Sequence, residues 1–435
     1  MYDHITFFFW VLSIFLFIHG VWIIDSYPAL LSFISESKSF FIIFSILFNL
    51  LLPVILDPIY LLFSIICTKS SFSKDAHKHY HLENKSPILY HKRYNISACF
   101  LEKCHPFDSK KYGRVYNLLR SPSSPHCLPL SPLVKITICP RYQLKIHPLF
   151  HLGLNYSMII SKCVEMPLCF LPAWFLRYRV LNPMLRATHA SLIGVCAAIR
   201  HGYAINLSGG YHHASLKIGA GFCVYPDITL AVNFLREYHP QYKTVLIVDL
   251  DAHQGNGYES DFKRIEQNAR KRRMSEEAKE FKAKSNELRI DGDEENNNKI
   301  ESEFEVVIMD MYNHDIYPGA LNARKRINVD ISAHWEDETD GYLHKVKEGL
   351  KKIYEHYTID FVIYNAGTDT MIGDPLGGLR VSEDGICLRD QIVFQEALER
   401  NIPILMLLSG GYQYSNAPVI ARSIYELVKK FNLKV

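Results

Sequence analysis

The sequence predicts an α/β domain in which a parallel β-sheet is covered by helices on both faces. Short apolar runs of strand type alternate with longer stretches of helical periodicity along most of the chain, and this alternation is typical of parallel sheets. Four of the apolar runs end in glycine close to a histidine, aspartate or tyrosine. Because ligands bind beyond the carboxyl ends of strands in such sheets, we expect the functional site at that edge.

The bulk composition is that of a globular protein without a large excess of charge. The chain has 435 residues, of which 48% are hydrophobic, enough for a sizeable core. Lys and Arg number 48 and Asp and Glu 45, so the net charge of +3 indicates no direct nucleic-acid partner. The 10 cysteines include no Cys-x-x-Cys pair, which favours a reduced chain without a cysteine-bound structural zinc.

Residues 1–68 form a hydrophobic region that differs from the rest of the chain. Residues 7–24 and 40–56 are two apolar runs whose lengths approach those of membrane-spanning helices. Lysines follow the second run, so the remainder of the chain is expected on the cytoplasmic side of a membrane. Two interpretations stay open: a membrane anchor within residues 7–67, or an artefact at the start of the predicted gene. Residues 69–86 are expected to be a linker.

Residues 87–435 are expected to form the main domain. Its predicted strands are short, apolar and rich in β-branched residues, and they are a short one near 88, then 203–207, 245–248, 304–309, 327–331, 361–364 and 404–408. Its predicted helices follow a period near 3.6, and they cover 110–119, 181–201, 228–237, 342–357 and 419–431. Residues 121–132 are rich in Pro and Ser and are expected to be a loop.

A charged insertion is expected at about 263–303. This stretch contains many acidic and basic residues and hardly any apolar ones, so it has too little apolar surface to form part of a core. We expect it to be part helix and part disordered. The basic run 270–273 is compatible with a nuclear signal, but a solvated charged helix is the favoured interpretation.

The central motif of the domain follows the predicted strand 245–248. Residues two apart on an extended chain point the same way, so Asp249, Asp251 and His253 share one side. Two carboxylates and an imidazole suit a divalent metal ion, and zinc is the commonest choice. Taken alone, the motif is also compatible with a strand whose polar end is merely solvated.

Pooling the strand ends predicts one metal centre. Asp251, His253 and Asp369 are the expected ligands, and three protein ligands leave a position for water and substrate. The site would then bind a single ion.

Other polar residues at the strand ends are candidates for proton transfer and charge stabilisation. His212 and His213 are not needed as ligands, and imidazole has a suitable pKa for moving a proton. Asp249 and Asn256 are candidates for orienting the two rings. Tyr412 is a candidate donor to an oxyanion, although it is equally compatible with a packing role, and a His pair is often structural.

Together these motifs resemble the zinc-dependent histone deacetylases, and most closely class IV, the histone deacetylase 11 type. The resemblance extends from about residue 87 to the C-terminus, with the insertion interrupting it. The general motifs are Gly209-Gly-Tyr-His-His213, the run 249–257, Asn365-Ala-Gly-Thr-Asp369, Gly373-Asp-Pro-Leu-Gly377 and Ser409-Gly-Gly-Tyr-Gln413. The class IV motifs are Arg93-Tyr-Asn95, Leu101-Glu-Lys103, His105-Pro-Phe-Asp108 and Ile316-Tyr-Pro-Gly319.

The resemblance implies the arginase/deacetylase fold, with the active site at the carboxyl ends of the strands, and hydrolysis of acyl-lysine amides in proteins such as histones. It implies a nuclear or cytoplasmic enzyme acting in chromatin and transcription regulation, zinc on the three ligands named above, and a potassium ion near Asp249. His213 would be the main general base and acid, assisted by His212, and Tyr412 would polarise the acyl carbonyl. The acyl group could be acetyl or a long fatty chain.

The resemblance also implies a substrate tunnel, and at one position the sequence departs from most classes of the family. Gly221 and Phe222 would form one wall of the tunnel and Tyr317 the other. Asn256 stands where most classes of the family have aspartate, which matches class IV. A neutral partner should make His213 less basic.

Two other functions are compatible with the sequence. An arginase-like ureohydrolase with two metal ions would need a further carboxylate, yet Gly255 stands where an Asp-x-His-x-Asp motif would place it. A catalytically silent, membrane-tethered protein that binds acyl-lysine would use the same fold without turnover.

Overall fold

The computed structural model describes residues 82, 84–97, 101–134, 136, 162–165, 173–268, 274–275, 304–319, 328–334 and 339–435. The expected membrane segments, most of the linker and most of the charged insertion lie outside these residues. Within the described part of the chain, no helix has both the length and the apolar character needed to cross a membrane.

The chain divides into two compact units. The first consists of residues 1–72, 140–162 and 166–179, and its described part contains the short helix α6 (Ala173–Leu176). The second consists of 73–139, 163–165 and 180–435, and it contains the sheet, the larger helices and every predicted site residue.

The second unit is built on a seven-stranded sheet in which every strand pair is parallel. The strand order is β1-β2-β7-β6-β3-β4-β5. The strands are β1 (Ile88–Leu89), β2 (Tyr203–Asn206), β3 (Thr244–Asp249), β4 (Glu305–Asn313), β5 (Val329–Ala333), β6 (Phe361–Asn365) and β7 (Ile404–Leu407). The predicted α/β fold with a parallel sheet is therefore confirmed.

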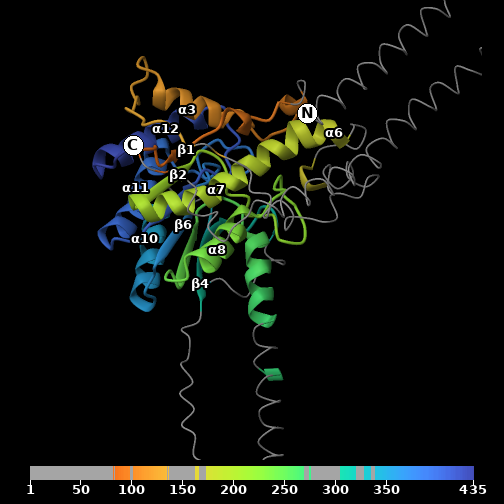
Figure 1. The fold of residues 1–435 in the computed structure, drawn as a ribbon, viewed down its shortest axis with the longest axis vertical. Helices are drawn as coiled ribbons and strands as arrows, with labels where there is room; N and C mark the ends of the chain where they lie inside the picture. The colour runs from red at the N-terminus through yellow and green to blue at the C-terminus, as the bar shows by residue number, and fades with distance from the viewer. Residues whose placement is uncertain are drawn as a thin grey trace, which may run out of the picture. The chain divides into compact units, whose positions relative to one another are not determined.

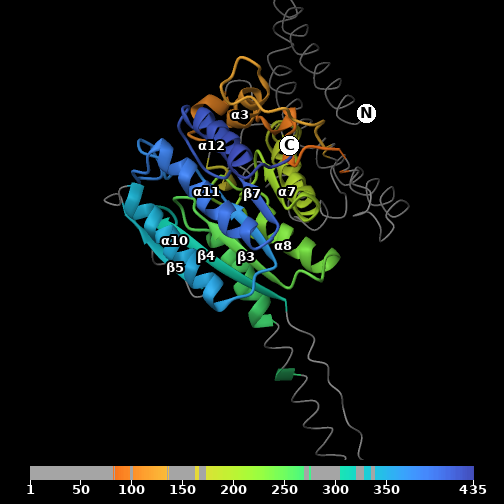
Figure 2. The ribbon, with the colours of Figure 1, turned by 90° about the vertical axis from the view of Figure 1, so that its left-hand side faces the viewer.

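Helices cover both faces of this sheet. Helices α7 and α8 pack against each other on one face, and α10, α11, α12 and α3 form a continuous row on the other (Figures 1 and 2). Their bounds are α3 (Lys111–Arg120), α7 (Asn182–His201), α8 (Asp227–Tyr238), α10 (Thr339–His356), α11 (Glu383–Glu399) and α12 (Asn416–Lys430). Residues 256–268 are also helical.

Three of the differences between the structure and the sequence prediction concern α11, β4 and β5. Helix α11 was not predicted, because it lies between α10 and α12 and buries charged as well as apolar residues, which hides a simple apolar stripe. Strand β4 continues past the predicted end at 309 to Asn313, because its last five residues pair with β5. For the same reason β5 begins at Val329, two residues later than predicted.

The register of the central strands brings the predicted motifs together. Asp249 at the end of β3 pairs with Asn365 at the end of β6, and Asn365 pairs with Leu407 of β7. Val245 to Val248 of β3 are fully buried, which anchors this edge in the core. The loops that leave β2, β3, β6 and β7 therefore start side by side.

Candidate metal centre and active site

The three predicted metal ligands lie together at the carboxyl edge of the sheet. Asp251 and His253 follow β3, Asp369 follows β6, and all three side chains are buried. Their candidate ligand atoms all lie within 4.8 Å of one another. The Nδ1 atom of His253 is 3.2 Å from Oδ1 of Asp251 and 2.9 Å from Oδ2 of Asp369. Among the described residues, this is the one such group of histidine, cysteine and acidic side chains.

The electrostatics of this group favour a bound cation. Burial lowers the pKa of His253, but hydrogen bonds and charge attraction from Asp251 and Asp369 outweigh it and raise that pKa to about 10. Burial and the neighbouring Asp251 carboxylate also raise the pKa of Asp369 to about 7. Two carboxylates forced together in the interior thus attract positive charge, and a divalent ion would satisfy them.

Glycines leave room around the same carboxylates. A Cβ atom on Gly367 would lie 2.2 Å from Oδ2 of Asp251, and one on Gly410 would lie 2.6 Å from Oδ2 of both Asp251 and Asp369. The backbone therefore approaches the carboxylates as closely as only glycine allows. The two carboxylates and one imidazole, their burial and the close approach of the glycine backbone all fit the metal ion that the sequence predicts.

The two predicted catalytic histidines stand beside the ligands and have different partners. Nδ1 of His212 donates to Oδ2 of Asp249 over 3.0 Å, whereas Nδ1 of His213 donates to Oδ1 of Asn256 over 2.8 Å. The ring centroids are 4.1 Å apart, and His213 is 5.8 Å from the ring of His253.

These partners separate the acid–base properties of the two rings. Burial lowers the pKa of His212, but the carboxylates of Asp251 and Asp249 raise it above the ordinary value. Burial, together with charge repulsion from His212 and His253, places the pKa of His213 well below its ordinary value. His213 is therefore neutral near neutral pH, which suits a general base.

Tyr412 and the predicted tunnel residues surround a small cavity. Its volume is about 20 Å³, and His213, Gly221, Phe222 and Tyr412 are among its lining residues. Tyr412 is half-buried, and its ring lies 6.1 Å from that of His253 and 6.0 Å from that of Phe222.

Tyr317 has a different position from the other tunnel residues. It does not line this cavity, its side chain is 43% exposed, and its ring lies 4.9 Å from that of His213. It therefore stands towards solvent, where the tunnel would open.

The sequence interpretation missed several side chains that hold the site loops. Asp227, the first residue of α8, accepts hydrogen bonds from the backbone N–H groups of Gly210 and Tyr211 over 2.9 and 2.7 Å. Asp374 accepts one from the N–H of Tyr412 over 2.8 Å. An acidic residue in the first turn of a helix was the available signal for Asp227.

Lys111 also holds a site loop. Its buried Nζ donates to the carbonyl oxygens of Ser409 and Gly410, each over 2.7 Å. Its position on α3, in a run of polar residues, indicates a solvated lysine, so nothing in the local sequence distinguishes it.

The fold and site define an α/β protein in which two carboxylates and one imidazole form a group that could hold a metal ion. The family model described as "Histone deacetylase domain" matches residues 171–428, more than half of the chain. The chain belongs to this histone deacetylase family, and its membership supports a hydrolase of the deacetylase type.

Individual relatives agree with this assignment. Histone deacetylase 2 of Arabidopsis thaliana is 36% identical over 350 residues, which are 80% of this chain and 80% of that protein. Histone deacetylase 1 of Oryza sativa subsp. japonica is 28% identical over 237 residues, covering 52% of this chain and 36% of that protein. The crystal structure of the HDA15 HD domain superposes with a TM-score of 0.55 at 19% identity, over 80% of this chain and 88% of that one, which shows the fold.

Proposed function

We propose that the protein is a zinc-dependent protein lysine deacylase that hydrolyses the amide of N6-acyl-lysine. The observation that carries the proposal is the convergence of Asp251, His253 and Asp369, whose ligand atoms lie within 4.8 Å of one another beside a neutral His213. These residues would hold the zinc ion, which when bound supplies a Lewis acid that polarises the acyl carbonyl and lowers the pKa of water.

The two histidines have different roles: His213 transfers the proton and His212 supplies charge. His213 is neutral, so it accepts the proton of the attacking water and then returns it to the leaving lysine amine. His212 is held by the buried Asp249 and has a raised pKa, so it contributes positive charge next to the developing oxyanion.

Tyr412 donates a hydrogen bond to the acyl carbonyl oxygen. Burial and nearby carboxylates, Asp369 and Asp251 among them, hold its pKa well above the ordinary value, so the phenol keeps its proton. A donor that strengthens its bond as charge develops on the oxygen lowers the barrier.

The substrate side of the site fits a lysine stem. Gly221 and Phe222 border the cavity, and Tyr317 stands at the solvent side. Gly221 has a φ of 50°, and a Cβ atom there would lie 2.4 Å from the ring of His213, so glycine keeps this passage open. The apolar walls suit the methylene groups of lysine, whose acylated amide carries no charge.

We propose that the protein belongs to class IV and that the acyl group it removes is acetyl or a long fatty chain. The support is the class IV motifs in the sequence, together with the neutral Asn256 as partner of His213. A potassium ion near Asp249 belongs to the same proposal. Asp249 is fully buried and accepts hydrogen bonds from Tyr258 and Asn365 over 3.0 and 2.9 Å.

A panel of lysine peptides with acyl groups from acetyl to palmitoyl tests the proposal. The purified full chain, loaded with zinc, should release lysine from at least one peptide, and the His213→Ala variant should not. If only peptides with short acyl groups are cleaved, the fatty-acyl part of the proposal is wrong. If the wild type contains zinc but cleaves no peptide, the silent acyl-lysine binder becomes the better description.

The arginase-like alternative has less support. Gly255 provides no carboxylate, and its N–H donates to Oδ2 of Asp310 over 3.0 Å. The described residues contain one group of potential ligands, suited to a single ion.

We also propose, from sequence composition, that residues 7–67 anchor the catalytic domain to a membrane on its cytoplasmic side. The cytoplasm or the nucleus is then the compartment of the active site. A fluorescent reporter fused to residues 1–86 should sediment with membranes, and a diffuse reporter would favour the gene-prediction artefact.

A further inference from the structure

Helix α11, which the sequence prediction missed, carries an arginine in the interior of the domain. The side chain of Arg389 is fully buried. Its Nη1 donates to the carbonyl oxygen of Gly367 over 2.6 Å and to that of Leu250 over 3.2 Å. The same nitrogen lies 3.3 Å from Oγ1 of Thr370. One guanidinium therefore joins two loops that leave different strands.

Both of these loops carry metal ligands. Leu250 immediately precedes Asp251, and Gly367 and Thr370 lie on either side of Asp369. The ladder between β3 and β6 ends where Asp249 pairs with Asn365. Arg389 therefore donates to both backbone segments just beyond the last residue pair that joins β3 and β6.

The other side of the guanidinium is held by its neighbour in the helix. Nε and Nη2 of Arg389 donate to Oδ1 of Asp390 over 3.0 and 2.9 Å. Asp390 in turn accepts from the hydroxyl of Tyr364 on β6 over 2.5 Å and from that of Ser423 on α12 over 2.6 Å. The planar fork is thus fixed in direction, and its Nη1 faces the two carbonyl groups.

This arrangement bears on the proposed metal centre because each of the two loops supplies at least one of its ligands. Asp251 and Asp369 are fully buried carboxylates close to each other, and like charges repel, so their separation determines how well an ion fits between them. The hydrogen bonds from Arg389 to the backbone near Asp251 and near Asp369 hold the two carboxylates at this separation. Supporting residues of this kind typically change metal affinity without touching the ion.

We propose that Arg389 is a positioning residue for the metal centre, setting its affinity and coordination geometry by clamping the carbonyl groups of Leu250 and Gly367. The inference rests on the proposed function in one respect, namely that Asp251, His253 and Asp369 bind a divalent ion. The competing explanation is a buried ion pair with Asp390 that stabilises the fold alone. In that case its loss lowers the melting temperature and leaves the metal affinity of folded protein unchanged.

Two conservative variants separate these explanations. Arg389→Lys keeps the charge, but a lysine ammonium lacks the planar fork that reaches Asp390 and both carbonyl groups at once. Asp390→Asn keeps the guanidinium and loosens the partner that orients it. Either variant alone tests the proposal if the other fails to fold.

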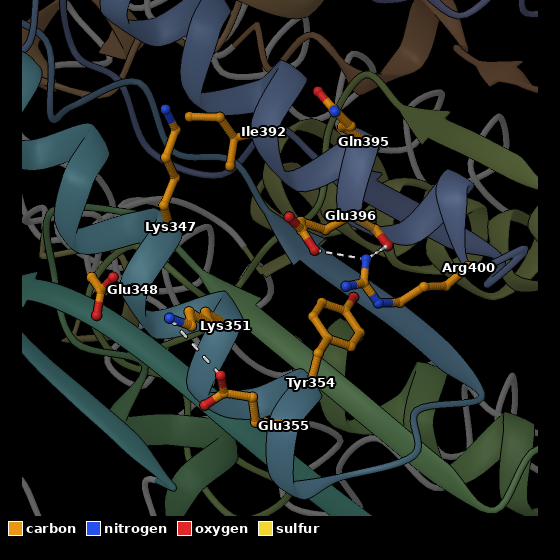
Figure 3. A pocket seen from close by; sticks show the side chains of 9 residues that line it. All are labelled: Lys347, Glu348, Lys351, Tyr354, Glu355, Ile392, Gln395, Glu396 and Arg400. Atoms are coloured by element: carbon orange, nitrogen blue, oxygen red, sulfur yellow. Dashed lines mark hydrogen bonds and ion pairs between the residues drawn. The ribbon is translucent and has the colours of Figure 1, made fainter.

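A matched control lies on the same helical layer. Arg400, which follows α11, lines a surface groove between α10 and α11, where its guanidinium stacks on Tyr354 at 4.3 Å and pairs with Glu396 at 2.7 Å (Figure 3). Neither Tyr354 nor Glu396 lies in a loop that supplies a proposed metal ligand. Arg400→Met therefore removes an arginine with an aromatic and an acidic partner and leaves the contacts of Arg389 unchanged.

The measurements are made on the full chain without any substrate. Zinc affinity is obtained by competition with a chromophoric chelator and normalised to the folded fraction from circular dichroism, and the visible spectrum of the cobalt(II)-substituted protein reports coordination. We expect Arg389→Lys and Asp390→Asn to bind zinc about 10- to 100-fold more weakly and to change the cobalt spectrum. Arg400→Met should match the wild type in both.

The outcomes distinguish this inference from the proposed function. If the wild type binds zinc and both clamp variants keep its affinity and cobalt spectrum while melting at lower temperature, Arg389 is only a structural residue and the inference is wrong. If the wild type itself binds neither ion, the proposed function fails, and the inference fails with it.

Discussion

The amide oxygen of Asn256 accepts a hydrogen bond from Nδ1 of His213 over 2.8 Å. The neighbouring ring, His212, instead donates to the carboxylate of Asp249. A neutral amide stabilises an imidazolium less than a carboxylate does, so this pairing keeps His213 in its basic, uncharged form.

Replacing Asn256 with aspartate should move the acid limb of the pH–activity profile to higher pH. Burial and the positive charge of His212 hold the pKa of His213 well below its ordinary value, so the wild type keeps a neutral base in mildly acidic solution. A carboxylate at 256 raises that pKa, and the base is then lost at a higher pH, by about one unit or more. The profile of kcat/KM against pH measures the shift, and an unchanged acid limb would argue against His213 as the base.

His213→Ala should reduce kcat by about 10²- to 10⁴-fold, because it removes the group that transfers the proton. The zinc content should stay at the wild-type level, since His213 is not one of the three ligands. His212→Ala serves as the comparison and should cost less, because that ring contributes charge rather than the transferred proton. Equal losses in the two variants would mean that the roles are shared.

Tyr412→Phe should lower kcat by about 10²- to 10³-fold with little change in KM. The phenol stands beside the proposed metal ligands and keeps its proton because its pKa is well above the ordinary value, so its hydroxyl acts on the charge that develops during the reaction. Steady-state kinetics on an acylated peptide separate the two constants. A change confined to KM would indicate a packing or binding role instead.

Gly410→Ala should abolish stoichiometric zinc binding. The added Cβ would lie 2.6 Å from carboxylate oxygens of both Asp251 and Asp369, so the ligands must move apart. Gly319→Ala is the control, because a Cβ there meets nothing within 4 Å and costs only the strain of a φ of 79°. Metal analysis of the two purified variants should show zinc in the control alone.

Lys111→Met should destabilise the domain by about 1–3 kcal/mol, because the carbonyl groups of Ser409 and Gly410 lose a buried donor. Turnover should fall as well, since Tyr412 follows these residues. Lys110→Met is the matched control: that side chain is 47% exposed, and its ion pair with Glu102 should contribute less than about 1 kcal/mol. Denaturant titration of both variants measures the difference.

Much of the fold was predictable because its signals are local. The β3 run Val245–Val248 is continuously apolar, as expected for a parallel strand with both faces covered, and the structure shows it fully buried. Helix α11 escaped prediction because neighbouring helices cover it on two sides, and Arg389 and Asp390 occupy positions that a local pattern assigns to solvent. The end of β4 depended on pairing with β5, which no local signal contains.

The amino-acid sequence by itself determined which chemical groups stand at the strand ends, since Asp249, Asp251 and His253 follow directly on the apolar run that forms β3. Only the tertiary structure decided how those groups are held. Lys111 reaches Ser409 across 298 residues of chain, and Arg389 reaches Leu250 across 139. The physical reason is that a buried cation acquires its partners from whichever backbone carbonyl groups folding brings beside it, and no local pattern encodes that neighbourhood.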